Sequence, residues 1–306
     1  MPNNLITILG PTASGKTALA TSLAYELKTE IISGDSRQVF KGLNIGSGKD
    51  LEEYQLEGVA IPYHLIDILE ANKHFSVYHF QQEFDKVFRS LIQKDKLPIL
   101  CGGSGLYIEA VLQGFEYTSI PPNASLRAKL ADQNLKILEE IHQKLTGNYV
   151  ANEIALSQKQ LTRAIEIQTF LSSNDWEKPN YLRVNPIVFG IDLPAEIRRE
   201  KIKKRLQVRL RNGMIEEVEG LIINGVSSER LRFFGLEYKF VVDYLEGISS
   251  FEAMEEQLFY AICQFSKRQM TYFRKMEKDG IKINWLDGQL PKKDLIDMMI
   301  THIKKA

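Results

Sequence analysis

An octapeptide near the start of the chain restricts the possible folds more than any other part of the sequence. Residues 10–17 read GPTASGKT and fit the phosphate-loop pattern G-x-x-x-x-G-K-[ST]. The preceding residues 5–9 form an apolar, β-branched run that predicts a buried strand, whereas residues 18–27 place Ala, Leu and Glu at helical spacing. A strand, a glycine-rich loop and a helix in this order are the setting in which the pattern binds phosphate.

The loop predicts a particular chemistry. Glycine at the first and sixth positions permits backbone angles that let successive N–H groups point inward, toward an anion held at a helix N-terminus. Lys16 adds a positive charge for phosphate oxygens, and the Thr17 hydroxyl is placed to bind Mg²⁺. The pattern alone does not decide which di- or triphosphate is bound. Its candidate phosphate-binding residues are Gly10, Pro11, Thr12, Ala13, Ser14, Gly15, Lys16 and Thr17.

Length and composition narrow the class of protein. The 306 residues are 44% hydrophobic and 25% charged, which is typical of a globular protein of about two domains. The 39 basic and 39 acidic residues cancel, so any nucleic-acid binding has to come from local basic patches. The two cysteines form no disulfide or zinc pattern, and we see no signal peptide or membrane span. We therefore expect a cytoplasmic protein.

The order of predicted elements indicates an interrupted α/β domain. Strands are expected at 30–33, 64–68, 97–101, 185–192 and 281–285, and helices at 76–94, 250–276 and 292–304. A helix after Pro194 is expected to run on through Met214. The alternation predicts a P-loop NTPase-like parallel sheet with flanking helices. Residues 115–183 show mainly helical periodicity, so we expect an all-helical insertion between core segments 1–114 and 184–306.

Polar residues follow several of these strands, where open α/β sheets bind their ligands. Asp35 is either a turn aspartate or a general base that faces the phosphates. Asp67 and Asp192 are either strand-end caps or a carboxylate that supports Mg²⁺, and His64 is more typical of a structural histidine. The second glycine turn, 102–105, is either simple turn chemistry or a site where Ser104 bonds a phosphate or the substrate.

Two basic helical stretches stand out in an otherwise neutral chain. One holds Arg198, Lys201, Arg205 and Arg209 at helical spacing, and the other, 267–275, mixes bases with Tyr272 and Phe273. Such stretches are commonly solvated helix faces. A local positive field can also hold phosphates, and bases mixed with aromatics suit unstacked RNA bases. Lys267 and Arg268 are therefore candidate RNA-binding residues.

Taken together, these segments resemble the tRNA dimethylallyltransferases, also called tRNA isopentenyltransferases. The matching stretches are GPTASGKT at 10–17, DSRQVF at 35–40, GSGK at 46–49, HLID at 64–67, GGSGLY at 102–107, RAIE at 163–166 and KRQMTYFR at 267–274. They run in order through most of the chain. The first and last are the most specific, because a phosphate loop alone is common. The chain departs from the family in carrying Lys159-Gln160 where a Gln-Arg pair is usual.

The resemblance implies a reaction and a set of roles. A dimethylallyl group would move from dimethylallyl diphosphate to N6 of the adenosine 3′-adjacent to the anticodon, in tRNAs that read codons starting with U. Asp35 would accept the N6 proton, Ser104 would assist at the diphosphate, and Arg205 would bind the diphosphate from the far side. The helical insertion would hold the anticodon stem-loop, and a monomer is expected. The residues implied to face tRNA are Asp35, Ser36, Arg37, Gln38, Ser104, Arg127, Lys159, Gln160, Leu161, Thr162 and Arg163.

Two other functions remain open at this point. The first is a free-nucleotide enzyme, either a small-molecule P-loop kinase or an adenylate isopentenyltransferase, although neither needs an extended basic surface. The second is a nucleotide-dependent RNA-binding switch without chemistry, which would prefer ATP or GTP to dimethylallyl diphosphate.

Overall fold

The computed structural model describes residues 3–145 and 157–305. The chain divides into two compact units. One comprises Met1–Gly114 and Leu182–Ala306, and the other is the intervening segment Phe115–Tyr181. We call them the core unit and the helical unit.

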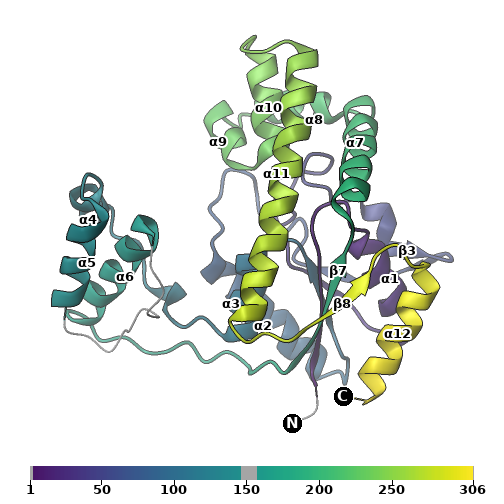
Figure 1. The fold of residues 1–306 in the computed structure, drawn as a ribbon, viewed down its shortest axis with the longest axis horizontal. Coiled ribbons are helices and arrows are strands. Elements are labelled where there is room, and N and C mark those ends of the chain that lie inside the picture. Colours follow the sequence, from purple (N-terminus) through teal and green to yellow (C-terminus); the bar gives the residue numbers. More distant parts are fainter. Residues whose placement is uncertain (1–2, 146–156, 306) are drawn as a thin grey trace. The chain divides into compact units, whose positions relative to one another are not determined.

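A six-stranded parallel sheet forms the centre of the core unit (Figure 1). Its strand order is β5-β2-β6-β1-β7-β8, so the strand before the phosphate loop lies between two neighbours. Ile6 of β1 pairs with Ile99 of β6 on one side and with Ile187 of β7 on the other. The predicted parallel sheet is confirmed. The strands are β1 (Leu5–Leu9), β2 (Ile31–Ser33), β5 (Tyr63–His64), β6 (Ile99–Gly102), β7 (Pro186–Asp192) and β8 (Ile283–Asp287).

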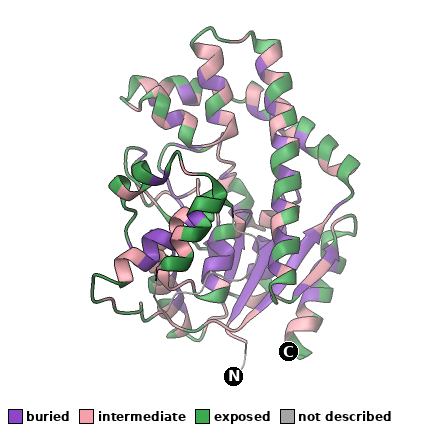
Figure 2. Cartoon of the chain, turned by 60° about the vertical axis from the view of Figure 1, so that its left-hand side comes forward, coloured by how far each residue is buried: buried purple, intermediate pink, exposed green. Residues whose placement is uncertain are grey.

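Helices cover both faces of this sheet, because its central strands β1 and β6 are apolar on both sides. Ile6 and Ile8 pack with α1 (Lys16–Leu27) and α12 (Lys292–Lys305) on one face. Leu5 and Leu9 pack on the other face, with α2 (Val77–Ile92), α3 (Gly105–Gln113) and the end of α11 (Phe251–Lys278). Figure 2 shows the central strands of the sheet buried, whereas the outer sides of the helices are exposed.

A second apolar cluster in the core unit joins four helices to the first half of α11. It includes Val218, Leu231, Tyr238 and Leu258, all at most 1% exposed. The expected helix through Met214 is two helices instead, because Gly213 adopts a positive φ of 98° and starts the second one. These helices are α7 (Ala195–Arg211), α8 (Met214–Ile223), α9 (Ser228–Phe233) and α10 (Leu236–Leu245).

The strand expected at 64–68 is wrong beyond its first residue. β5 ends at His64, and Leu65 and Asp67 then adopt positive φ values of 61° and 54°, which a strand cannot contain. Just upstream lies a hairpin that the sequence did not predict, formed by β3 (Gln55–Leu56) and β4 (Val59–Ala60). The short 3₁₀ helix Leu51–Tyr54 precedes it.

The turn after β5 is anchored by a buried lysine. The ammonium of Lys49 donates to the carbonyl of Phe40 at 2.7 Å and to the side chain of Asn44 at 3.0 Å, and it pairs with Asp67. Lys49 is 1% exposed, and burial lowers the pKa of its ammonium. Asp67, a candidate Mg²⁺ carboxylate from sequence, thus has a structural cation as its partner.

We expect Lys49→Met to destabilise the core unit by about 1–3 kcal/mol, because a buried carbonyl and an amide oxygen lose their donor. This expected loss of stability is small because the Asp67 side chain is 36% exposed, so water can replace part of the ion pair. Urea unfolding of Lys49→Met beside Lys41→Met, whose lysine forms an exposed ion pair, measures the difference. Equal stabilities of the two variants would contradict this assignment.

The helical unit has its own small core. Leu130, Leu138, Leu161 and Ile165 pack together and are at most 5% exposed. Beside them, the buried Glu166 carboxylate accepts two hydrogen bonds from Arg127, at 2.7 and 2.8 Å, and one from Arg163 at 3.2 Å. These bonds lower the pKa of Glu166 although its burial opposes this. The helices are α4 (Ala124–Leu130), α5 (Leu135–Lys144) and α6 (Gln158–Leu171), after the 3₁₀ turn Tyr117–Ser119.

Within residues 3–145 and 157–305, no helix combines the length and the apolar character that crossing a membrane requires.

Candidate active site

Three loops meet at the carboxyl edge of the sheet because their strands are neighbours. The phosphate loop follows β1, residues 103–105 follow β6, and residues 34–38 follow β2. The backbones of the last two loops are in direct contact, since the Ser104 N–H donates to the Gly34 carbonyl at 3.3 Å. A Cβ on Gly102 would lie 2.3 Å from the Gly34 carbonyl oxygen, so only glycine permits this approach.

The phosphate loop has the conformation that an anion cradle requires. Ala13 and Gly15 adopt positive φ values of 62° and 85°, and α1 starts at Lys16 directly afterwards. A Cβ on Gly10 would lie 2.7 Å from the Ser14 hydroxyl, so this position also excludes a side chain. Burial lowers the pKa of Lys16, while the carboxylate of Asp35 favours its charged form.

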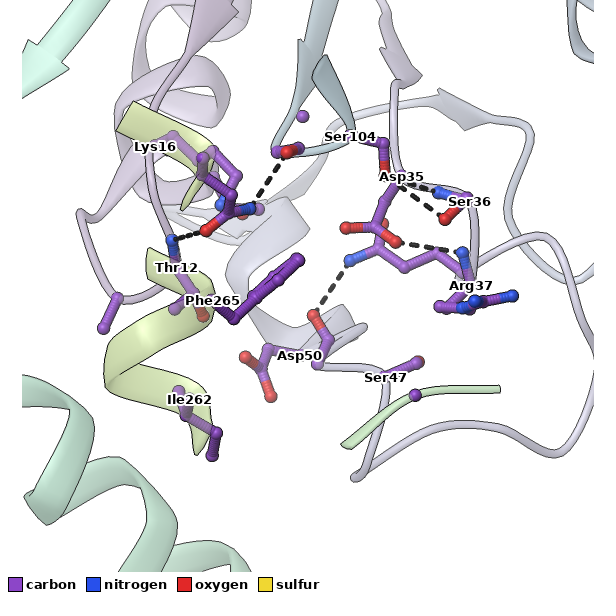
Figure 3. Close-up of a pocket in the computed structure, with 18 of the residues that line it drawn as sticks. Thr12, Lys16, Asp35, Ser36, Arg37, Ser47, Asp50, Ser104, Ile262 and Phe265 are labelled. Carbon is purple, nitrogen blue, oxygen red and sulfur yellow. Dashed lines mark hydrogen bonds between the residues drawn. The ribbon is translucent and has the colours of Figure 1, made fainter. Parts of the chain in front are cut away.

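A pocket of about 680 Å³ opens over these three loops. Its wall is completed by residues 46–54, by α7 and α10, and by α11 with Ile262, Phe265 and Arg268. Figure 3 shows Thr12 and Lys16 on one side of the space and Asp35, Ser36 and Arg37 on the other. Every lining residue belongs to the core unit.

Hydrogen bonds to backbone N–H groups hold the Asp35 side of the pocket (Figure 3). The Arg37 N–H donates to Asp35 Oδ1 at 2.9 Å, and the Ser36 N–H donates to Ser104 Oγ at 3.0 Å. Asp35 is therefore a turn aspartate, one of the two roles expected from sequence. Its carboxylate also faces the pocket. Ser104 binds the Asp35 loop in this structure.

The pocket carries opposed charges. Arg205 reaches from α7 to the Thr12 hydroxyl, and burial, together with nearby Arg209, lowers the pKa of its guanidinium to about 10. It therefore stays positive at neutral pH. Burial raises the pKa values of the carboxyl groups of Glu53 and Glu237, which also line the pocket.

Most candidate residues of the core unit line one pocket, whereas Gly10, Pro11, Ser14 and Lys267 do not. Thr12, Ala13, Gly15, Lys16 and Thr17 line the pocket together with Asp35, Ser36, Arg37, Gln38, Ser104, Arg205 and Arg268. Lys267 is exposed and is absent from the lining. Asp192 pairs with Arg274 at 3.1 Å and is also outside the lining.

The other candidates lie in the helical unit. Lys159 and Gln160 are exposed, and the side chain of Gln160 accepts the N–H of Ser157 to cap α6. Leu161 is 3% exposed, so its side chain is a core residue and the expectation of a side-chain contact with tRNA is wrong. Thr162 bonds the carbonyl of Gln158 within α6.

Sequence reasoning missed several lining residues. Asp50, Glu53 and Glu237 line the pocket, although none of the three was a candidate residue from sequence. Arg209 was noted as part of a basic stripe, but its ion pair with Asp50 at 2.7 Å was not foreseeable. Gly48 also lines the pocket, and its place in the GSGK stretch could have indicated it as a site residue. A Cβ on Gly48 would lie 2.6 Å from the Arg209 guanidinium.

The donor set suits Mg²⁺ bound beside phosphates. Mg²⁺ prefers oxygen ligands and commonly takes one or two from protein, with water and substrate phosphates completing its shell. Thr17 lines the pocket with the Asp35 and Asp50 carboxylates, so such oxygens are present. Among the residues that the structure describes, no three His, Cys, Asp or Glu gather as a metal cluster.

Fold and pocket together define a P-loop α/β protein in which the phosphate loop and a carboxylate line one pocket. The family described as IPP transferase matches residues 38–276. A "tRNA dimethylallyltransferase 2" from Phocaeicola vulgatus is 47% identical over 97% of this chain and 96% of its own length. The chain belongs to the tRNA dimethylallyltransferase family and is a prenyltransferase.

Solved structures agree. The full-length tRNA isopentenylpyrophosphate transferase from Bacillus halodurans superposes with a TM-score of 0.72 at 27% identity, over 99% of this chain and 97% of that one. A tRNA isopentenylpyrophosphate transferase from Staphylococcus epidermidis gives a TM-score of 0.70 at 30% identity, with 100% and 99% covered.

Proposed function

We propose that this protein transfers a dimethylallyl group from dimethylallyl diphosphate to N6 of the adenosine 3′-adjacent to the anticodon, in tRNAs that read codons starting with U. Diphosphate is released. The observation that carries the proposal is the placement of the phosphate loop and Asp35 in the lining of one pocket, in a chain of this family.

The proposed chemistry follows from the charges in the pocket. The allylic C–O bond breaks, its electrons stay on the diphosphate, and the N6 nitrogen bonds the prenyl carbon and loses a proton to Asp35. Negative charge that develops on the leaving oxygens is stabilised by the loop N–H groups, Lys16 and Arg205. These donors are already placed, so little reorganisation accompanies the reaction.

The Thr17 hydroxyl is the proposed protein ligand of Mg²⁺. When bound, Mg²⁺ would supply further positive charge at the leaving diphosphate. This assignment rests on the position of Thr17 in the loop pattern and on its place in the pocket lining.

The proposed RNA contacts lie in both units. The target adenosine has to leave its stack to enter a pocket. Ser36, Arg37, Gln38 and Arg268 line the pocket and suit the flipped nucleotide, and exposed Lys267 suits a phosphate. In the helical unit, we propose that Lys159, Gln160, Thr162 and Arg163 face the anticodon arm. Arg127 is 51% exposed although it pairs with Glu166, which leaves it room for a phosphate.

Labelled dimethylallyl diphosphate tests the proposal directly. We expect label in unmodified tRNA, and none in AMP or in a tRNA with guanosine at the target position. We also propose that the protein acts as a monomer in the cytoplasm. Label on AMP alone would favour an adenylate isopentenyltransferase, and binding of ATP far tighter than dimethylallyl diphosphate in calorimetry would favour a kinase or a nucleotide switch.

A further inference from the structure

One buried side chain connects two of the three loops. Gln269 of α11 is 8% exposed. Its Oε1 accepts the N–H of Thr12 in the phosphate loop at 2.8 Å, and its Nε2 donates to the carbonyl of Gly103 at 2.9 Å. A single planar amide thus bonds the loop after β1 and the loop after β6.

The glycines at 103 and 105 are explained by this contact with α11. A Cβ on Gly103 would lie 2.6 Å from Gln269 Nε2, and a Cβ on Gly105 would lie 2.3 Å from the ring of Tyr272. Gln269 and Tyr272 are three residues apart on α11 and so share one face. The Tyr272 hydroxyl in turn bonds Glu109 of α3. The second glycine turn is therefore shaped to receive this helix.

The amide also completes a chain of bonds across the pocket. It joins Thr12 to Gly103, the next residue is Ser104, and Ser104 Oγ accepts the N–H of Ser36 at 3.0 Å. Asp35 immediately precedes Ser36 and is fixed by the Arg37 N–H. The phosphate loop and the carboxylate are thereby linked at a set separation.

We propose that Gln269 is a positioning residue, which sets the distance between the phosphate loop and the loop that carries Ser104, and so aligns the diphosphate with the acceptor side. The inference rests on the proposed function, since it assigns the two sides of the pocket to donor and acceptor. A misplacement of about 1 Å between reacting groups can cost on the order of 10²-fold in rate.

Glutamine suits this role because it offers a donor and an acceptor at the end of one side chain. Asparagine carries the same amide on a stem shorter by one methylene and cannot reach both loops. Methionine keeps the length and fills the space but bonds neither partner. Both variants leave the Thr12 N–H and the Gly103 carbonyl without the amide.

We expect Gln269→Asn and Gln269→Met to lower the single-turnover rate with tRNA by about 10–100-fold. KM for dimethylallyl diphosphate and the affinity for inorganic pyrophosphate should stay within about threefold, because Lys16, Arg205 and the other N–H groups of the phosphate loop remain. Gln81→Asn is the matched control: Gln81 is 2% exposed, donates to the Ala110 carbonyl at 3.0 Å, and lies outside the pocket lining. The melting temperature of Gln81→Asn should fall by about as much as that of the Gln269 variants, whereas its single-turnover rate should stay unchanged.

An unchanged rate in the Gln269 variants, or a raised KM with an unchanged kcat, would overturn the proposal. The unmodified protein gives a test that needs neither a folded variant nor activity. In NMR amide exchange without ligand, the Thr12 N–H should be protected, and free exchange of that amide would also overturn the bridge. If the unmodified protein transfers no prenyl group to tRNA while Thr12 is protected, the proposed function fails and the bridge stands.

Discussion

Replacing Asp35 with alanine is expected to lower the single-turnover rate of prenyl transfer by about 10²–10⁴-fold, the usual contribution of a positioned general base. The affinity for tRNA should be nearly unchanged, because the other lining residues remain. Rapid-quench measurement with labelled donor gives the rate, and filter binding gives the affinity.

Asp35→Asn separates the base from the turn. The asparagine oxygen can still accept the Arg37 N–H that Asp35 accepts at 2.9 Å, so the loop should keep its conformation while proton acceptance is lost. The matched control is Asp192→Ala, which removes another strand-end aspartate outside the pocket lining. An undiminished rate in Asp35→Asn would remove Asp35 from the role of base.

Arg205→Ala is expected to lower the rate by about 10²–10³-fold, the usual effect of losing one preorganised donor to a developing negative charge. Melting followed by circular dichroism should show that the fold persists, since the guanidinium end of Arg205 faces Thr12 and the pocket. Arg198→Ala is the control, because Arg198 lies on the same helix but outside the pocket lining. An unfolded Arg205→Ala protein would show that this basic stripe is structural.

Much of the fold could be predicted because its signals are local. The apolar run before the phosphate loop, the Ser76 N-cap of α2 and the run from Pro186 to Asp192 each specify an element on their own. The prediction for the segment after His64 was wrong because it also used local signals alone. Its apolar letters favour a strand, but Leu65 and Asp67 turn to positive φ, and the buried Lys49 that pairs with Asp67 lies 18 residues earlier.

The site was less predictable, because its geometry depends on contacts between residues that are distant in sequence. The motifs identified Asp35, Ser104 and Arg205, and the structure brings all three to one pocket. The contact between Gln269 and Thr12 spans 257 residues, and no periodicity links them. Leu161 illustrates the opposite error, since a segment implied to face RNA also has to supply core residues at its buried positions.

The single helix α11 runs from the cluster around α10 to the sheet face that α2 and α3 cover (Figure 1). At 1.5 Å per residue, Met254 and Gln269 lie about 22 Å apart along its axis. A tilt of roughly 3° about the Met254 end would therefore displace the glutamine by about 1 Å, by leverage alone. Substitution of a buried side chain in this cluster that lies outside the pocket lining, such as Val242, should then alter turnover as well as melting temperature.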